Sequence, residues 1–257
     1  MAALLVRLFH LMLVRPLVLA LLRPRVLNAD RLPRRGPAIL VANHNSHLDT
    51  LVLMSLFPLP LVDRLRPVAA SDYYLRGRLR AWLSTRLFRI VPVRRSGFRV
   101  SDGHPLGGCS EALDRDDILI MFPEGTRGEP ERLAPLKPGI AHLVRRHPDV
   151  PVVPVVLRGV GTALPKGRIV PRPASCRVAV GKAVEWNGRR NPFMASLEAA
   201  MAEVARSADR PLRASPAART TAGLRRSIGI LDAARLIRRR SAGPSWARSP
   251  SLVPRAG

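Results

Sequence analysis

The sequence predicts an α/β fold, a layered sheet of mostly parallel strands flanked by helices. Short apolar runs recur along the chain, and segments with helical spacing of apolar residues separate them. One run, at 152–157, is apolar throughout, which is typical of a parallel strand buried on both faces. A chain of 257 residues is long enough for one such domain with appendages.

The first expected element is an amphipathic helix. Residues 1–22 are strongly apolar, but Arg7, His10 and Arg15 interrupt them, and Pro16 follows. At about 100° per residue these three side chains fall within about 140° of one another and leave a broad apolar face. No uninterrupted apolar run approaches the roughly 20 residues of a spanning helix, and Arg15 would lie inside the apolar core of a signal peptide. We therefore expect a helix in the membrane interface with its arginines towards the head groups; a helix packed on the protein's own core is the alternative.

A connector and the first buried strand follow. Residues 23–37 are rich in proline and contain glycine, which indicates a connector, with one short strand at 25–27. The apolar run 38–42 ends in polar, turn-forming residues, as a buried strand does where it enters a loop. A helix is expected at 50–57 because Pro58 stops it.

Strands and helices then alternate along the chain. From apolar runs, strands are expected at 67–70, 89–93, 118–122, 152–157 and 177–180; from helical spacing, helices are expected at 76–88, 103–116 and 138–146. In sheets of this kind, ligand sites lie in the loops at strand ends. We therefore look for functional residues in those loops.

The C-terminal tail has a different composition. Residues 206–257 are rich in Arg, Ser, Ala and Pro and poor in aromatic residues, so we expect them to be basic and largely disordered. At 221–240, apolar residues recur at three and four positions among arginines, which predicts a second membrane-surface helix or, alternatively, a solvated tail. The expected organisation is a membrane helix and connector at 1–27, a catalytic domain at 28–205, and this tail.

The charge balance limits the kinds of partner. Lys and Arg number 43 against 18 Asp and Glu, a net charge of +25, for which an anionic membrane or nucleic acid is the physical candidate. Few aromatic residues and no zinc-finger, RRM or KH pattern argue against nucleic acid. Cys109 and Cys176 stand far apart and form no C-x-x-C pair, so we expect no metal site or disulfide framework and a reducing compartment.

The first candidate catalytic residues lie in the loop after residue 42. His44 and Asp49 stand five positions apart, so on one straight helix their side chains would be about 140° apart. They can meet if His44 lies in the turn and Asp49 on the first helical turn. An imidazole beside a carboxylate is a general-base arrangement. Ser46 and Asp49 also fit a capping box, in which case Asp49 would only close a helix N-terminus.

Three further blocks make the pattern specific. The sequence Asn43-His44-x-Ser46-x-x-Asp49 is followed by Val91-Pro-Val-Arg-Arg95, Phe122-Pro-Glu-Gly-Thr-Arg127 and Val150-Pro-Val-Val-Pro-Val155. In these blocks and in their order, the chain resembles the glycerolipid acyltransferase family, the lysophosphatidate and lysophospholipid acyltransferases. The resemblance runs from about Arg25 to Val184.

The resemblance implies how the reaction would proceed. His44 matches the family's general base, which takes the proton of the acceptor hydroxyl, and Asp49 matches the partner of that base. No serine or cysteine nucleophile is required, so Ser46 is not expected to be one. His47 is near in sequence, but the match selects His44.

The resemblance also implies substrate-binding residues. Arg95 matches the functional arginine of the second block, although Arg94 before it departs from the commoner pattern and leaves the acceptor head group open. Lys137 matches a basic residue expected to meet the donor's phosphates. The expected binding residues are Arg95, Glu124, Gly125, Thr126, Arg127 and Lys137; no metal and no cofactor are expected.

The expected function is membrane-associated O-acyl transfer from acyl-CoA or an acyl carrier protein to a lyso-glycerophospholipid, with 1-acylglycerol-3-phosphate to phosphatidate as the leading reaction. The alternatives are remodelling of a lysophospholipid with another head group, hydrolysis of the thioester, and a non-catalytic membrane-binding protein. The expected location is the cytoplasmic face of the cell membrane, as a peripheral or monotopic protein with membrane lipids and the acyl donor as partners. The sequence leaves the oligomeric state open.

Overall fold

The computed structural model describes residues 2–71, 78–93, 105–126, 128, 132–164 and 170–210. Arg95, Arg127 and the helix expected at 221–240 lie outside these ranges.

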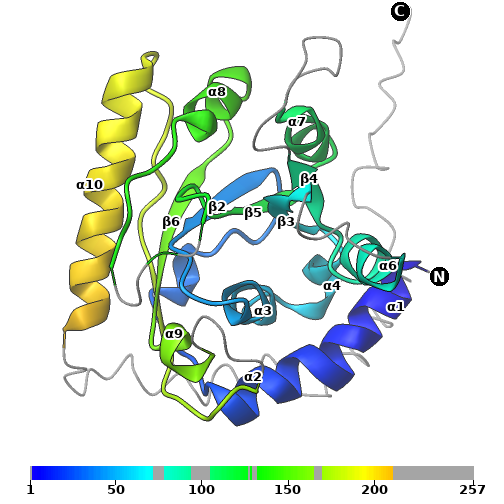
Figure 1. Ribbon diagram of the computed structural model, residues 1–257. Helices are drawn as coiled ribbons and strands as arrows, with labels where there is room; N and C mark the ends of the chain where they lie inside the picture. Colours follow the sequence, from blue (N-terminus) through cyan, green and yellow to red (C-terminus); the bar gives the residue numbers. More distant parts are fainter. Residues whose placement is uncertain are drawn as a thin grey trace, which may run out of the picture. The chain divides into compact units, whose positions relative to one another are not determined.

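The described strands form one seven-stranded sheet in the order β1-β7-β6-β2-β5-β3-β4 (Figure 1). The strands are β1 (Arg25–Leu27), β2 (Ala38–Ala42), β3 (Leu65–Ala70), β4 (Val91–Val93), β5 (Ile118–Met121), β6 (Val152–Arg158) and β7 (Arg177–Val180). Neighbouring strands pair in parallel except β6 and β7, which are antiparallel. The predicted fold class is confirmed.

Helices cover both faces of the sheet. They are α3 (Leu48–Ser55), α4 (Leu59–Val62), α6 (Arg78–Arg86), α7 (Gly107–Asp114), α8 (Gly139–Arg146), α9 (Val160–Ala163) and α10 (Arg190–Asp209), besides a 3₁₀ turn at Ala29–Arg31. Figure 1 shows α3 and α4 on one side of the sheet and α7, α8 and α10 on the other. Successive residues of β2 point to opposite faces, as strand geometry requires: Leu40 packs towards α3, and Ile39 and Val41 pack towards α7 and α8.

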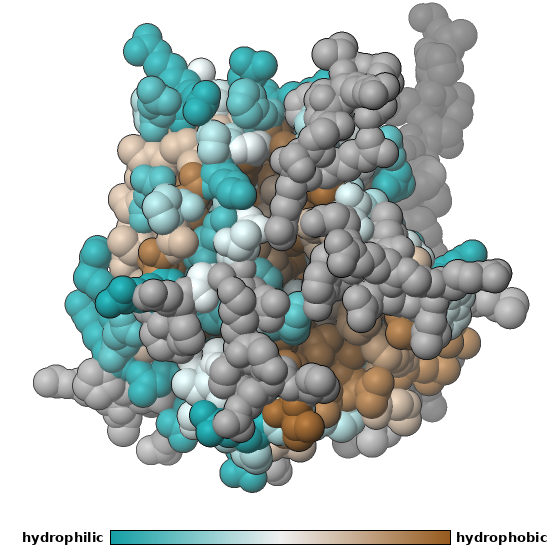
Figure 2. Space-filling model, in the orientation of Figure 1, coloured by the Kyte–Doolittle hydropathy of each residue, from teal (hydrophilic) through white to brown (hydrophobic). Residues whose placement is uncertain are grey.

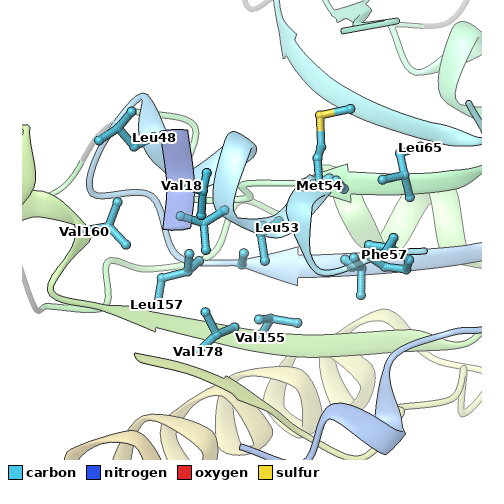
Figure 3. Packing of buried hydrophobic residues seen from close by; sticks show 14 of the residues in the cluster. Val18, Leu48, Leu53, Met54, Phe57, Leu65, Val155, Leu157, Val160 and Val178 are labelled. Carbon is cyan, nitrogen blue, oxygen red and sulfur yellow. The ribbon is translucent and has the colours of Figure 1, made fainter. Parts of the chain in front are cut away.

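The core on the α3 side joins residues from distant parts of the chain. Leu53, Met54 and Phe57 from the α3 region belong to the same buried cluster as Val155 and Leu157 of β6 (Figure 3). All five are at most 1% exposed. Burying such side chains contributes about 1.5–3 kcal/mol each, so this layer holds α3 against the sheet. The loop between β2 and α3 carries the His-x4-Asp pattern.

The N-terminal segment is a continuous helix that differs from the sequence-based expectation. It consists of α1 (Ala2–Phe9), a π-helical turn (His10–Val14) and α2 (Arg15–Leu21). Its polar groups face the protein: Arg7 pairs with Asp63 at 2.9 Å, and an Arg15 guanidinium N–H donates to the backbone oxygen of Phe57 at 2.5 Å. The expectation that these arginines point towards lipid head groups was therefore wrong.

The apolar side of this helix is the exposed side. We call it the N-terminal apolar face: Leu4, Leu5, Leu8, Met12, Leu13, Leu17 and Leu19, all at least 37% exposed. It contributes to the brown surface at the lower right of Figure 2. A second stripe, with Val14, Val18 and Leu22, is buried in the core. By length and composition alone, Ala3–Leu21 could cross a membrane even though Arg7 and Arg15 interrupt its apolar residues; a core helix or a signal sequence would satisfy the same criterion.

Two elements differ from the expected organisation. The strand expected in the connector, β1, pairs with β7 and so belongs to the sheet rather than to a separate N-terminal unit. The long helix α10 was not predicted; it packs with Phe193, Leu197 and Met201 in the core on the α8 side. Its residues extend past the expected domain end at 205.

Candidate active site

The site forms where β2 and β5 leave the sheet at the same edge. Val41 of β2 lies opposite Met121 of β5 in a parallel register. Because the carboxyl ends of parallel strands meet at one edge, the loops that begin at Asn43 and Phe122 start side by side. The sheet thus brings the first and third sequence blocks together.

Asn43 fixes the start of the first loop. Its side-chain amide donates to the backbone oxygen of Leu157 at 3.1 Å, and the N–H of Leu157 donates to its side-chain oxygen at 2.8 Å. These two bonds extend the pairing of β2 with β6 one residue beyond the strand. The chain then turns with His44 as the first residue free of the sheet.

The structure brings His44 and Asp49 into contact. Nδ1 of His44 lies 2.9 Å from Oδ2 of Asp49. A carboxylate can only accept, so Nδ1 carries the proton and Nε2 is left as the acceptor. His44 is 17% exposed at its side chain, whereas the Asp49 side chain is fully buried.

Asp49 also holds the turn in which His44 lies. Its Oδ2 accepts the backbone N–H groups of Asn45 at 2.6 Å and Ser46 at 2.7 Å. The bond to Ser46 is the one a capping box would make, so the two alternatives drawn from the sequence coexist on one oxygen. Ser46 is buried, and its hydroxyl donates to the backbone oxygen of Leu164 at 3.2 Å.

The second loop is a tight turn stacked on the base. The N–H of Gly125 donates to the backbone oxygen of Phe122 at 3.0 Å, and Gly125 has φ +76°, a conformation that favours glycine. The Phe122 ring stacks on the His44 ring, with centroids 4.3 Å apart and planes 25° apart. The N–H of Gly128 donates to the backbone oxygen of His44 at 3.0 Å. Both ends of this turn are therefore attached to His44.

Glu124 lies buried beside the base. Its residue is 5% exposed, and neither carboxylate oxygen has a hydrogen-bond partner of acceptable geometry among the described residues. Burial raises the pKa of Glu124, more than the nearby backbone amides and His44 lower it. A buried carboxylate that has no well-aligned hydrogen bond and lies next to a base is a candidate to accept a hydrogen bond from a substrate hydroxyl.

Lys137 lies over the same turn. Its backbone N–H donates to the oxygen of Pro123 at 2.9 Å. A Cβ built on Gly125 would lie 2.5 Å from Nζ of Lys137, so the ammonium occupies the space that only a glycine leaves open. Thr126 is exposed on the turn. Six of the eight predicted site residues are thus described. Four of them, His44, Asp49, Gly125 and Lys137, are tied to this edge of the sheet by hydrogen bonds, and Glu124 lies buried beside His44.

Two residues at the site were not predicted as functional. Phe122 and Asn43 belong to the matched sequence blocks, but the blocks alone assign no role to either residue. Both residues lie at the ends of predicted strands, where functional residues are expected. Their partners, Leu157 for Asn43 and His44 for Phe122, are far away in sequence, so the contacts could not be predicted. His47, the possible rival of His44, directly precedes α3 and is not the histidine bonded to Asp49.

The described residues contain no group of three or more His, Cys, Asp or Glu placed to hold a metal ion. Both cysteines are free and buried. Burial raises the pKa of the Cys109 thiol to about 12, so it is a poor nucleophile at neutral pH.

Comparisons with known proteins agree with the sequence blocks. The family model named Acyltransferase matches residues 23–158, more than half of the chain. The 1-acyl-sn-glycerol-3-phosphate acyltransferase alpha of Mus musculus is 29% identical over 186 residues, which cover 71% of this chain and 62% of the relative. The human protein of that name is 30% identical over 59% of this chain and 51% of its own length. The chain thus spans less than two thirds of these relatives.

A plant protein and a solved structure extend the comparison. The 1-acyl-sn-glycerol-3-phosphate acyltransferase of Limnanthes douglasii is 32% identical over 55% of this chain and 48% of its own length. The crystal structure of the 1-acyl-sn-glycerophosphate acyltransferase PlsC from Thermotoga maritima superposes with a TM-score of 0.63 at 20% identity, covering 82% of this chain and 81% of that one. At this identity the structural match supports the fold alone.

Proposed function

We propose, because the chain belongs to the acyltransferase family, that it transfers a fatty acyl group from an acyl thioester to the hydroxyl of a lyso-glycerophospholipid, and specifically converts 1-acylglycerol-3-phosphate to phosphatidate. The observation that carries the proposal is the His44–Asp49 pair held against the Phe122–Gly125 turn. The His44–Asp49 pair can activate a hydroxyl, and the ammonium of Lys137 lies over the turn beside it. The names of the relatives in the comparisons support the same substrate class.

The chemistry follows from the protonation of His44. Nδ1–H is bonded to Asp49, so Nε2 is free to accept the proton of the acceptor hydroxyl. The hydroxyl oxygen attacks the thioester carbonyl and forms a tetrahedral oxyanion, and Asp49 stabilises the imidazolium. Collapse of the intermediate forms the new ester, breaks the C–S bond and returns the proton from His44 to the leaving thiolate. Ser46 takes no part because its hydroxyl is buried and bonded to Leu164.

The acceptor phosphate would be held by Arg127, the arginine of the third sequence block. Arg95 and Lys137 are the other cations of the matched pattern, and Lys137, which lies over Gly125, is the one expected to meet the phosphates of the donor. Arg127→Lys keeps the charge but loses the planar fork that binds phosphate through two bonds. We expect a roughly tenfold to hundredfold lower kcat/KM, mainly through a raised KM for the lyso-lipid. A defect confined to the KM of the donor would move the acceptor phosphate to Arg95 or Lys137.

The acyl donor is proposed to be acyl-CoA or an acyl carrier protein, with no resident cofactor. The deciding experiment offers one labelled acyl-CoA, and separately one labelled acyl carrier protein, with a panel of lyso-lipids differing in head group. Phosphatidate formed only when acceptor is present supports the proposal. Free fatty acid formed without acceptor would indicate hydrolysis, and no turnover of any pair would indicate a non-catalytic protein.

We further propose that the N-terminal apolar face lies in the lipid interface at the cytoplasmic side of the membrane. A soluble surface rarely exposes seven large apolar side chains on one helix, and the substrate is a lipid. Deleting residues 1–22 would also remove Val14, Val18 and Leu22 from the core, so it is not a clean test. Leu5→Ser with Leu8→Ser and Met12→Ser alters exposed positions only, and should weaken binding to anionic vesicles while leaving the unfolding midpoint near that of the parent. Full binding by this variant would contradict the proposal.

A further inference from the structure

The contact between His44 and Phe122 joins the base to the acceptor turn. The two rings are stacked, 4.3 Å between centroids and 25° between planes. Phe122 is half-buried and packs against the core on the α3 side, so its ring is itself held in place. The contact arises because β2 and β5 leave the sheet in register, with Val41 opposite Met121.

Without this contact, the imidazole would be less well fixed. The bond from Nδ1 to Asp49 holds one edge of the ring but leaves it able to tilt about that bond. A base is effective only while its nitrogen stays within hydrogen-bond reach of the proton that it takes. A second ring lying flat against one face prevents the tilt and keeps Nε2 directed to one place.

The stacked ring also has an electrostatic effect. The face of an aromatic ring carries negative charge density and attracts a cation within about 6 Å of its centroid. His44 becomes a cation only after it has taken the proton. Phe122 therefore interacts more strongly with the imidazolium formed during the reaction than with the neutral imidazole of the resting site.

We propose that Phe122 is a positioning residue for the acyl transfer, acting through the imidazole of His44. This inference rests on the proposed function. It assigns to Phe122 a role in kcat rather than in substrate binding. Phe122→Leu keeps an apolar side chain of similar size but removes the ring, and should lower kcat about 3- to 30-fold with the acceptor KM little changed. Phe122→Tyr keeps the ring and should restore most of the rate.

The matched control is Phe193→Leu. Phe193 is fully buried and also contacts an aromatic ring, that of Trp186 at 5.4 Å between centroids, but on α10 and away from His44. Phe193→Leu should lower the stability of the protein without changing kcat per folded molecule. If Phe122→Leu and Phe193→Leu change kcat equally, or if Phe122→Tyr is as slow as Phe122→Leu, the positioning role is wrong.

Two further measurements separate this inference from the proposed function. In a His44→Ala background, Phe122→Leu should cause no further loss of rate, because the group it acts through is gone. Independently of activity, the Nδ1–H signal of His44 in ¹⁵N-histidine-labelled protein should persist in the parent and in Phe122→Tyr but broaden in Phe122→Leu. An unchanged signal in Phe122→Leu would overturn the stacking role even in an active enzyme. A wild-type protein that transfers no acyl group would overturn the proposed function, and with it the role of Phe122 in that reaction, whatever the signal shows.

Discussion

Oδ2 of Asp49 lies 2.9 Å from Nδ1 of His44 and also accepts the backbone N–H groups of Asn45 and Ser46. One buried oxygen therefore orients the base and holds the turn that carries it. The two tasks place different demands on the side chain: the turn needs any acceptor, whereas the base needs a negative charge. Substitutions at Asp49 can separate them.

Asp49→Asn should lower activity far more than stability. The amide oxygen can still accept the backbone N–H groups, but it does not stabilise an imidazolium. We expect kcat to fall about 10²–10⁴-fold with a small loss of stability. Asp49→Ala should add a loss of about 1–3 kcal/mol for each buried N–H left without an acceptor. Steady-state kinetics and urea unfolding of both variants check this; equal stability of Asp49→Asn and Asp49→Ala would mean that the turn does not depend on this oxygen.

His44→Ala should abolish most turnover while leaving the fold and lipid binding intact. Removing a positioned general base lowers the rate about 10²–10⁴-fold. His47→Ala is the matched control, because it removes a histidine from the same loop that is not the one bonded to Asp49. It should do much less. A larger kcat defect in His47→Ala than in His44→Ala would reverse the assignment.

Much of the fold could be predicted from local patterns. The strands at 38–42 and 177–180 have the bounds expected from their apolar runs. The helix α10 carried a comparable signal, since Phe193, Leu197, Met201 and Val204 recur at three to four positions, so its omission was not forced by the sequence. The spacing of apolar residues along the chain is enough to predict a helix with one apolar side, and this spacing is present in α10.

What could not be predicted depends on contacts between distant segments. Periodicity grouped Arg7, His10 and Arg15 on one side of the N-terminal helix, but it cannot say whether that side faces lipid or protein. Asp63 and the backbone of Phe57 decide this, and they lie far along the chain. At the site, the His44–Asp49 pair could be proposed from spacing and resemblance. The stacking of Phe122 required the register of β2 on β5.

Gly125→Ala should disturb Lys137 as well as the backbone. A side chain at φ +76° is strained by about 1–2 kcal/mol, and the new methyl group would displace the Lys137 ammonium, 2.5 Å away. Gly188→Ala is the matched control: its φ is +84°, and no atom lies within 4 Å of its added Cβ. Both variants should lose similar stability, but only Gly125→Ala should lose kcat/KM. Equal activity of the two would remove Lys137 from the site.

Glu124→Gln should make the protein more stable and less active. Burial raises the pKa of Glu124 above the ordinary value of 4.5, so the folded protein binds this proton more tightly than the unfolded chain. The contribution of this group to stability is therefore full below about pH 4.5 and falls as pH rises towards the raised pKa. Gln carries no charge, so the advantage of Glu124→Gln over the parent should grow from pH 4 to pH 7. Urea unfolding across that range measures it, with Glu198→Gln on the exposed side of α10 as the control that should show no such trend. If Glu124→Gln proved less stable than the parent at pH 7, the carboxylate would be ionised and paired in the folded protein, and it would hold the site together rather than wait for a substrate hydroxyl.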